Sequence, residues 1–162
     1  MFVPLVEEPV TIEPCSLGSV EARALIAALN AELSQRYPDP VDSFFSLGED
    51  EVSAGRGAFL VARANGKPVG CGAVRKLDEA TAELKRMYVV PAARGRRLGG
   101  RILAALELET RRLGVTRLVL ETGRNQPEAV ALYLRAGYRE IPCFGQYVGS
   151  TQSLCFEKVS AP

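Results

Sequence analysis

A basic, glycine-rich segment near the middle of the chain has the composition of an anion-binding loop. It reads Pro91-Ala92-Ala93-Arg94-Gly95-Arg96-Arg97-Leu98-Gly99-Gly100-Arg101 and precedes a run with helical periodicity. Glycines let backbone N–H groups approach a ligand, and the first turn of a helix presents unpaired donors with a partial positive charge. The pattern therefore predicts a phosphate-binding loop, and the alternative is a solvated basic turn.

The charge distribution favours an anionic ligand at the same place. The net charge is only +1, but acidic residues outnumber basic ones by ten to three in residues 1–57. Residues 85–117 reverse this balance, with Glu107 and Glu109 against the bases Lys85, Arg86, Arg94, Arg96, Arg97, Arg101, Arg111, Arg112 and Arg117. Neither the three-glycine dinucleotide pattern nor the Gly-Lys-Ser/Thr of a Walker loop is present. We expect a diphosphate ligand, bound by other means.

The absence of histidine narrows the chemistry that the chain can perform. It excludes Ser-His-Asp and Cys-His nucleophilic sites and removes the commonest transition-metal ligand. The cysteines, Cys15, Cys71, Cys143 and Cys155, are scattered and form no CxxC pair, so we expect reduced core residues and no metal site. Acid and base chemistry must then use carboxylates, tyrosine, lysine or cysteine.

Length and composition are those of an ordinary globular protein. The 162 residues fit a single domain, 1–162, and hydrophobic content of 47% with charged content of 24% is typical of that class. No apolar run reaches the roughly 18 residues that span a bilayer, and residues 1–8 lack the order of a signal peptide. We expect a cytoplasmic protein with no membrane partner.

The basic loop must be positioned by the elements around it, which the apolar periodicity outlines. The Asn65-Gly66 turn predicts a hairpin, and a strand, helix, strand, helix order around the loop predicts parallel neighbours. The expected elements are a strand at Val10–Glu13, a helix at Ser19–Leu33 capped by Ser19, a loop with one short helix at Tyr37–Gly57, strands at Ala58–Ala64, Val69–Leu77 and Thr81–Val90, a helix at Leu98–Leu113, a strand at Val115–Glu121, a helix at Pro127–Arg135, and two weaker strands around Phe144-Gly145 and Leu154-Cys155-Phe156.

Two motifs resemble those of the GNAT acetyltransferase family. Met87-Tyr88-Val89-Val90-Pro91 followed by Arg94-Gly95-Arg96-Arg97-Leu98-Gly99 is similar to its acetyl-CoA motif, Q/R-x-x-G-x-G/A, with Arg97 in place of the central glycine. The segment from Gln126 to Tyr138 is similar to its N-x-x-A-x-x-L-Y-x-x-x-G-F/Y helix, with Gln126 at the asparagine position. The resemblance implies the α/β (α+β) GNAT fold, a central mixed, mostly antiparallel sheet of six to seven strands flanked by about four helices.

The resemblance also implies a reaction and a set of site residues. An N-acetyltransferase moves acetyl from acetyl-CoA to a primary amine, here on a small molecule or, as a second choice, on a peptide or protein. Tyr133 corresponds to the tyrosine that protonates the coenzyme thiolate, and Glu83 stands where some relatives keep a general base, unless it only pairs with Lys85 or Arg86. The implied coenzyme-binding residues are Met87, Tyr88, Val89, Arg94, Gly95, Arg96, Arg97, Leu98, Gly99, Gly100, Asn125, Gln126 and Tyr133.

The acceptor and other partners are less constrained by the sequence. The family builds its acceptor pocket partly from the loop after the first helix, where an acidic wall would suit a cationic amine. That loop offers Asp39, Asp42, Phe44, Phe45 and Glu49, although a solvated acidic face is the alternative. A non-catalytic acyl-CoA-binding regulatory module is a second functional hypothesis. Nucleic-acid binding is disfavoured because no aromatic platform accompanies the arginines. A homodimer is compatible with the sequence.

Overall fold

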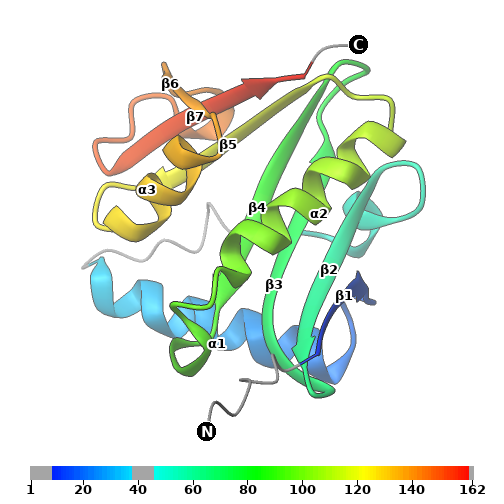
Figure 1. Cartoon of the computed structure of the whole chain (residues 1–162). Coiled ribbons are helices and arrows are strands. Elements are labelled where there is room, and N and C mark those ends of the chain that lie inside the picture. The colour runs from blue at the N-terminus through cyan, green and yellow to red at the C-terminus, as the bar shows by residue number, and fades with distance from the viewer. Residues whose placement is uncertain (1–8, 38–45, 161–162) are drawn as a thin grey trace, which may run out of the picture.

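The structure, a computed structural model, describes residues 9–37 and 46–160, which form one sheet with helices on both faces (Figure 1). The strands are β1 (Val10–Pro14), β2 (Gly57–Ala64), β3 (Lys67–Lys76), β4 (Thr81–Val89), β5 (Arg117–Gly123), β6 (Arg139–Ile141) and β7 (Ser153–Val159). The α-helices are α1 (Val20–Arg36), α2 (Leu98–Arg112) and α3 (Pro127–Arg135), and the 3-10 helices are η2 (Glu49–Val52), η3 (Pro91–Ala93) and η4 (Gly145–Tyr147).

The sheet is mixed and mostly antiparallel, which confirms the predicted fold class. Its seven strands follow the order β1-β2-β3-β4-β5-β7-β6, and within the described residues only β4 and β5 pair in parallel. Parallel pairing requires a crossover, which α2 provides. The described residues contain three α-helices, and the short helix expected in the loop after the first helix is η2.

One face of the sheet is covered by α2. The helix packs over β2, β3 and β4, and its side chains Ile102, Leu103 and Leu106 are buried there. A Cβ atom at Gly72 of β3 would lie 2.6 Å from Leu106 Cδ1 and 2.8 Å from Met87 Sδ. The missing side chain lets α2 lie close to the sheet, and this sets how near its N-terminus comes to β4.

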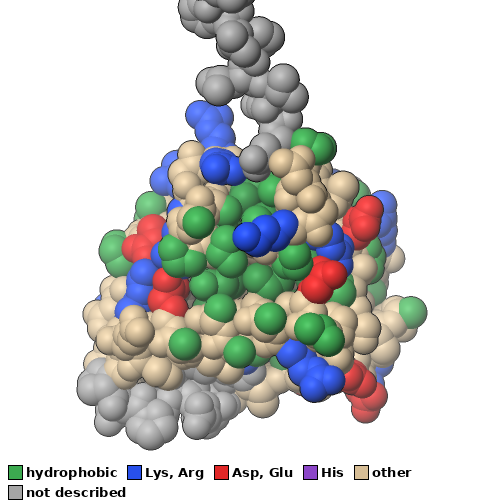
Figure 2. All heavy atoms as spheres, turned by 90° about the horizontal axis from the view of Figure 1, so that it is seen from below, with side chains coloured by type: hydrophobic (Ala, Val, Ile, Leu, Met, Phe, Trp, Pro, Cys, Tyr) green, Lys and Arg blue, Asp and Glu red, His purple; other side chains and the backbone are tan. Residues whose placement is uncertain are grey.

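The opposite face is covered by α1. Ser19 caps this helix as predicted, because its Oγ accepts the N–H of Ala22 at 3.1 Å. Leu25, Leu29 and Leu33 form a core cluster with Phe59 and other side chains of β2, β3 and β4. Seen from below, where α1 lies in Figure 1, hydrophobic side chains gather toward the middle of the face and charged ones lie mostly around them (Figure 2).

The C-terminal part of the sheet differs from the prediction. The strand expected around Phe144-Gly145 is wrong, because Gly145 begins η4 with a φ of +52°. The strand before it is β6, and Pro142 follows it without an N–H to continue the ladder. The other weak strand is confirmed as β7, which pairs with both β5 and β6.

Three further structural findings concern the described residues only. No helix in them is long and apolar enough to cross a membrane. They contain no group of three or more histidine, cysteine, aspartate or glutamate side chains arranged to hold a metal ion. All four cysteines fall within them as free thiols, with Cys71 and Cys155 buried.

Candidate active site

The candidate site begins where β4 and β5 diverge. Their parallel register runs from Thr81↔Arg117 to Leu84↔Leu120, although β4 continues to Val89 and β5 to Gly123. Val90 N–H donates to Val69 O of β3, so by alternation along the strand the amide of Val89 faces the gap on the β5 side. The backbone N–H of Val89 is therefore directed into the opening.

A β-bulge in β4 lies beside this opening. Cys71 pairs with Tyr88 and Ala73 pairs with Lys85, so that one residue of β3 opposes two of β4. Arg86, one of those two residues, has a φ of +60°. A bulge bends its strand, and this one lies just past Leu84, the last residue of β4 that pairs with β5.

The basic loop leads from β4 into α2 and leaves the helix N-terminus without a side-chain cap. Arg97 occupies the N-cap position in the left-handed region, with φ +60° and ψ +21°, and its side chain caps no N–H. The first intrahelical bond is Arg101 N–H to Arg97 O at 3.2 Å. The N–H groups of Leu98, Gly99 and Gly100 therefore remain available to an anion.

These features line one cleft of about 890 Å³ between β4, β5, α1, α2 and α3. The cleft passes between the diverging strands, so side chains from both faces of the sheet reach it. It includes most of the predicted coenzyme-binding residues, namely Met87, Tyr88, Val89, Arg94, Gly95, Arg97, Leu98, Gly99, Gly100, Gln126 and Tyr133. The lining also contains Leu84, Lys85, Glu121, Thr122, Leu132 and Arg135, among others.

Tyr133 of α3 lines this cleft and is itself buried. Only 5% of it is exposed, and its ring contacts the rings of Tyr138 and Phe156 at centroid distances of 5.8 Å and 6.4 Å. Burial, and then the charge of Glu121, raise the pKa of the Tyr133 hydroxyl above its usual value. The hydroxyl stays protonated at neutral pH and can act as a proton donor.

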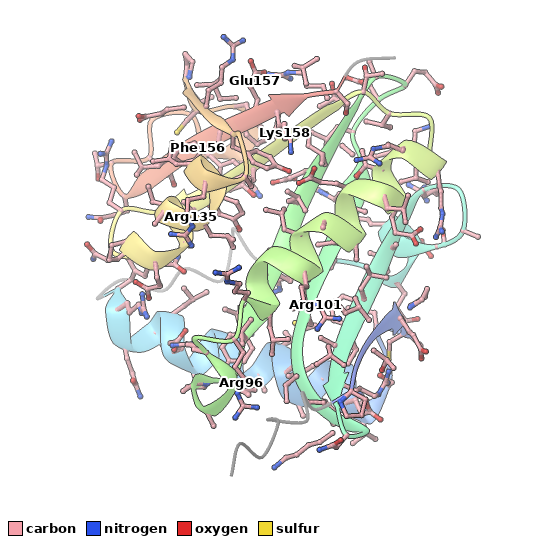
Figure 3. The ribbon with its side chains drawn as sticks, viewed as in Figure 1. Arg96, Arg101, Arg135, Phe156, Glu157 and Lys158 are labelled. Atoms are coloured by element: carbon pink, nitrogen blue, oxygen red, sulfur yellow. The ribbon has the colours of Figure 1, made fainter. Side chains whose placement is uncertain are left out.

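The arginines of the loop differ in their partners and in their position relative to the cleft. Arg94 donates to Val89 O at 3.0 Å and pairs with Glu32 of α1 at 2.7 Å, and its guanidinium lies 5.8 Å from the centroid of the Tyr88 ring. Arg96 lies at the outer end of the loop and is absent from the cleft lining, and Arg101 lies on the flank of α2 that faces away from α3 (Figure 3). Arg97 and Arg135 also line the cleft. Among the described residues, neither forms an ion pair with an acidic side chain.

Asn125 lies outside the cleft lining. Its amide donates to Arg36 O at 3.3 Å, and its backbone N–H donates to the Tyr37 hydroxyl at 3.2 Å. The Arg36 guanidinium donates to Asn125 O at 3.1 Å. These bonds attach the end of α1 to the turn before α3, whereas the neighbouring Gln126 does line the cleft.

Glu83 is buried in a polar network and does not line the cleft. Only 1% of it is exposed. Its Oε1 accepts from Arg75 Nε at 3.0 Å and Nη2 at 2.8 Å, and its Oε2 accepts from the Tyr147 hydroxyl at 2.7 Å. Arg75 also pairs with Glu51 of η2. The cation that forms an ion pair with Glu83 is thus Arg75, and not Lys85 or Arg86 as the sequence suggested. Both carboxylate oxygens of Glu83 accept hydrogen bonds.

Glu121 is a site residue that the sequence reasoning missed. It lies in β5 just past the last residue paired with β4, and it lines the cleft. Burial raises the pKa of its carboxyl to about 7, with a further rise from the charge of Glu83 against the effects of Ser153 and Lys85. The sequence did contain a signal for Glu121, which is a single carboxylate directly after the apolar run Leu118–Leu120. A residue at the end of a buried strand lies near the opening where neighbouring strands separate.

Most of the proposed acceptor wall lies outside the described residues. Asp39, Asp42, Phe44 and Phe45 fall in residues 38–45, for which nothing is described. Glu49 begins η2, and its carboxylate lies against Gly18, where an added Cβ would be 2.5 Å from Glu49 Oε1. Glu49 therefore lies near the start of α1, away from the cleft lining.

Known proteins resemble this chain in both sequence and fold. The profile of the acetyltransferase (GNAT) family matches residues 23–138. The "IAA acetyltransferase" of Azospirillum brasilense is 38% identical over 135 residues, which cover 83% of this chain and 87% of the relative. The "Uncharacterized N-acetyltransferase YjgM" of Escherichia coli is 33% identical over 126 residues, covering 72% of this chain and 75% of the relative.

Solved structures agree with the sequence relatives. A crystal structure named for an acyl-CoA N-acyltransferase of Klebsiella pneumoniae superposes with a TM-score of 0.81 at 35% identity, over 93% of this chain and 97% of that one. A GNAT family acetyltransferase of Elizabethkingia anophelis with acetyl-CoA bound has a TM-score of 0.66 at 19% identity, over 93% and 97% of the two chains, and shares the fold. The chain therefore belongs to the GNAT family and is an acyltransferase that moves an acetyl group from acetyl-CoA to an amine.

Proposed function

We propose that the chain acetylates a primary amine on a small molecule, with Tyr133 as the general acid for the departing thiolate. The observation that carries the proposal is that the uncapped N-terminus of α2 and Tyr133 line the same cleft. The first can hold a diphosphate and the second can donate a proton, which are the two ends that a bound thioester coenzyme must meet.

The residues present fit acetyl-CoA in three respects. The first turn of α2 offers backbone N–H donors to the diphosphate, and Arg97 lies at the same position. The splay between β4 and β5 leaves backbone groups near Val89 for the amide-bearing arm of the coenzyme. A cleft of about 890 Å³ is within the range of ligand and cofactor sites.

Glu83 is the general base that the family resemblance suggests. Its two oxygens already accept from Arg75 and Tyr147, so a Glu83 base would have to act through that network or through a water.

The acceptor class is tested by measuring the release of free thiol from acetyl-CoA. A panel should contain small primary amines, IAA because of the name of the Azospirillum relative, and lysine-containing and free-amino peptides, each against a blank without acceptor. We expect turnover with small primary amines above that with peptides. Faster turnover with peptides would favour the alternative, peptide or protein acetylation. Tight coenzyme binding with no turnover on any acceptor would favour a regulatory acyl-CoA-binding module.

Tyr133→Phe tests the general acid. The variant keeps the ring that packs on Tyr138 and Phe156 but removes the proton donor, so we expect kcat to fall about 10²-fold or more while coenzyme binding persists. Tyr138→Phe is the matched control, because Tyr138 is an equally buried neighbour that does not line the cleft. Equal kcat values for the wild type and Tyr133→Phe in steady-state assays would rule out this role.

A further inference from the structure

We propose that Glu121 is the catalytic residue that takes the proton from the attacking amine. The inference rests on the proposed function and names a group that the family motifs do not mark. It is carried by the position of Glu121, on the face of the sheet opposite Tyr133 and within the same cleft.

The position follows from the register of β5. Leu118 and Leu120 belong to the core cluster beneath α2, so Glu121, the next residue, projects from the other face of the sheet. Pairing with β4 ends at Leu120, so the carboxylate stands where the two strands have separated. Tyr133 approaches the same opening from the side of α2 and α3. A thioester held in the opening would therefore meet a proton donor from one face and a carboxylate from the other.

The groups around Glu121 suit a base that works near neutral pH. The charged and titratable side chains that act on it or respond to its charge are Glu83 and Lys85 of β4, Tyr133 of α3, Tyr147 of η4 and Cys155 of β7, and Ser153 gives it a hydrogen bond. Burial is the main cause that raises the pKa of Glu121 to about 7. A carboxyl with this pKa is ionised in a large fraction of molecules at pH 7 and binds a proton more strongly than an ordinary glutamate.

Glu83, a buried carboxylate on the same face of the sheet, is less accessible than Glu121. Glu83 and Lys85 flank Leu84 of the α2-side core and so lie on the same face as Glu121. Glu83 is held by Arg75 and Tyr147 and does not line the cleft, whereas Glu121 does. Lys85 donates to Ser46 O at 3.1 Å. Of the two carboxylates, Glu121 is the one that an incoming amine can reach.

The proton transfers balance with these two residues alone. The nitrogen of a neutral primary amine attacks the thioester carbon and forms the C–N bond, which makes that nitrogen positively charged and acidic. The Glu121 carboxylate takes one proton from it. The C–S bond then breaks with its electron pair on sulfur, and the thiolate takes the hydroxyl proton of Tyr133. The Tyr133 phenolate recovers a proton from the Glu121 carboxylic acid, directly or through water, so no net proton is released.

Glu121→Gln tests the inference, because it keeps the shape and a hydrogen-bonding oxygen but cannot accept the proton. In the wild type, kcat/KM should rise with pH through about 7 as the base becomes ionised. In the variant, we expect kcat to fall about 10²-fold or more and the rise near pH 7 to vanish. Calorimetric coenzyme A binding should stay unchanged, which shows that the fold and the coenzyme site are intact.

Two comparisons make the outcome decisive. Glu140→Gln, on the exposed strand β6, should keep both kcat and the pH profile. Glu83→Gln removes a partner of Arg75 and should lower thermal stability. Its profile should still rise with pH, at a lower pH than in the wild type, because the charge of Glu83 no longer raises the pKa of Glu121. Persistence of that rise in Glu121→Gln, or its loss in Glu83→Gln alone, overturns the assignment to Glu121 and leaves the acetyltransferase function standing. A wild type that acetylates no acceptor overturns the function and the inference together.

Discussion

Arg97 is the residue at which this chain departs from the glycine of its family motif, and the structure shows what the departure involves. Its backbone lies in the left-handed region that glycine enters freely, which costs another residue about 1–2 kcal/mol. The residues after it, Leu98, Gly99 and Gly100, form the first turn of α2 and line the cleft. The loop geometry of the motif is thus kept with arginine at the strained position.

Arg97→Gly should therefore stabilise the unliganded chain. Relief of about 1 kcal/mol corresponds to a rise in Tm of roughly 2–4 °C for a domain of this size, measurable by thermal melting. Arg101→Gly is the matched control of opposite sign, because glycine within α2 should destabilise by about 1 kcal/mol. Tm values that fall by the same amount in both variants would contradict the strain at Arg97.

The proposed catalytic side chains were not equally predictable from the sequence. Tyr133 and the loop residues were predicted by two motifs, and most of them line one cleft. Glu121 was missed because the predicted strand ended at that residue, whereas β5 runs on to Gly123. The proposed role of Glu121 depends on the residue at which β5 stops pairing with β4. This pairing register is set by tertiary structure and cannot be predicted from a single sequence.

At the scale of elements, one carboxylate, that of Glu157, links the three strands β5, β7 and β6 at the C-terminal edge of the sheet. Glu157 of β7 accepts from Arg117 Nε of β5 at 2.6 Å and from Arg139 Nε of β6 at 2.9 Å. The next residue, Lys158, points to the other face and pairs with Glu107 of α2 at 2.9 Å. The short strand β6 thus depends on ion pairs as well as on the backbone ladder.

Glu157→Gln should reveal this contribution through its pH dependence. Hydrogen bonds from Arg117 and then Arg139 hold the pKa of Glu157 below its usual value. A lowered pKa stabilises the fold above the unfolded pKa of about 4.3, and the gain is lost as pH falls through the folded pKa. We expect the variant to be less stable than the wild type by about 1 kcal/mol at pH 7 in urea denaturation, since both arginines are partly exposed. A difference of the same size at pH 3 would contradict this account.

The elements themselves were largely predictable, and the exceptions have local causes. Hydrophobic periodicity and the Asn65-Gly66 turn placed β2, β3 and β4, and Ser19 marked the start of α1. The β4 bulge was not foreseen, since it rests on the left-handed backbone of Arg86 and on the packing of Gly72 against Met87. The strand expected around Phe144 became η4, where Tyr147 bonds to Glu83 across the sheet.

At the scale of the molecule, the fold brings two differently charged regions to opposite sides of one opening. Arg94, Arg96, Arg97 and Arg101 lie in the loop and the first turn with which α2 begins. The carboxylates Glu83 and Glu121 lie on the face of α1, together with Lys85. Both sides meet between β4 and β5, the parallel pair at the centre of a mostly antiparallel sheet. An anionic coenzyme and an amine can therefore approach from different sides and meet at the splay.

The structure of this chain crystallised with coenzyme A is the most direct test of that arrangement. We expect the diphosphate oxygens within about 3 Å of the first-turn N–H groups of α2 and the coenzyme sulfur within about 4 Å of the Tyr133 hydroxyl. A coenzyme bound outside the β4–β5 opening, or a sulfur directed away from Tyr133, would contradict the account.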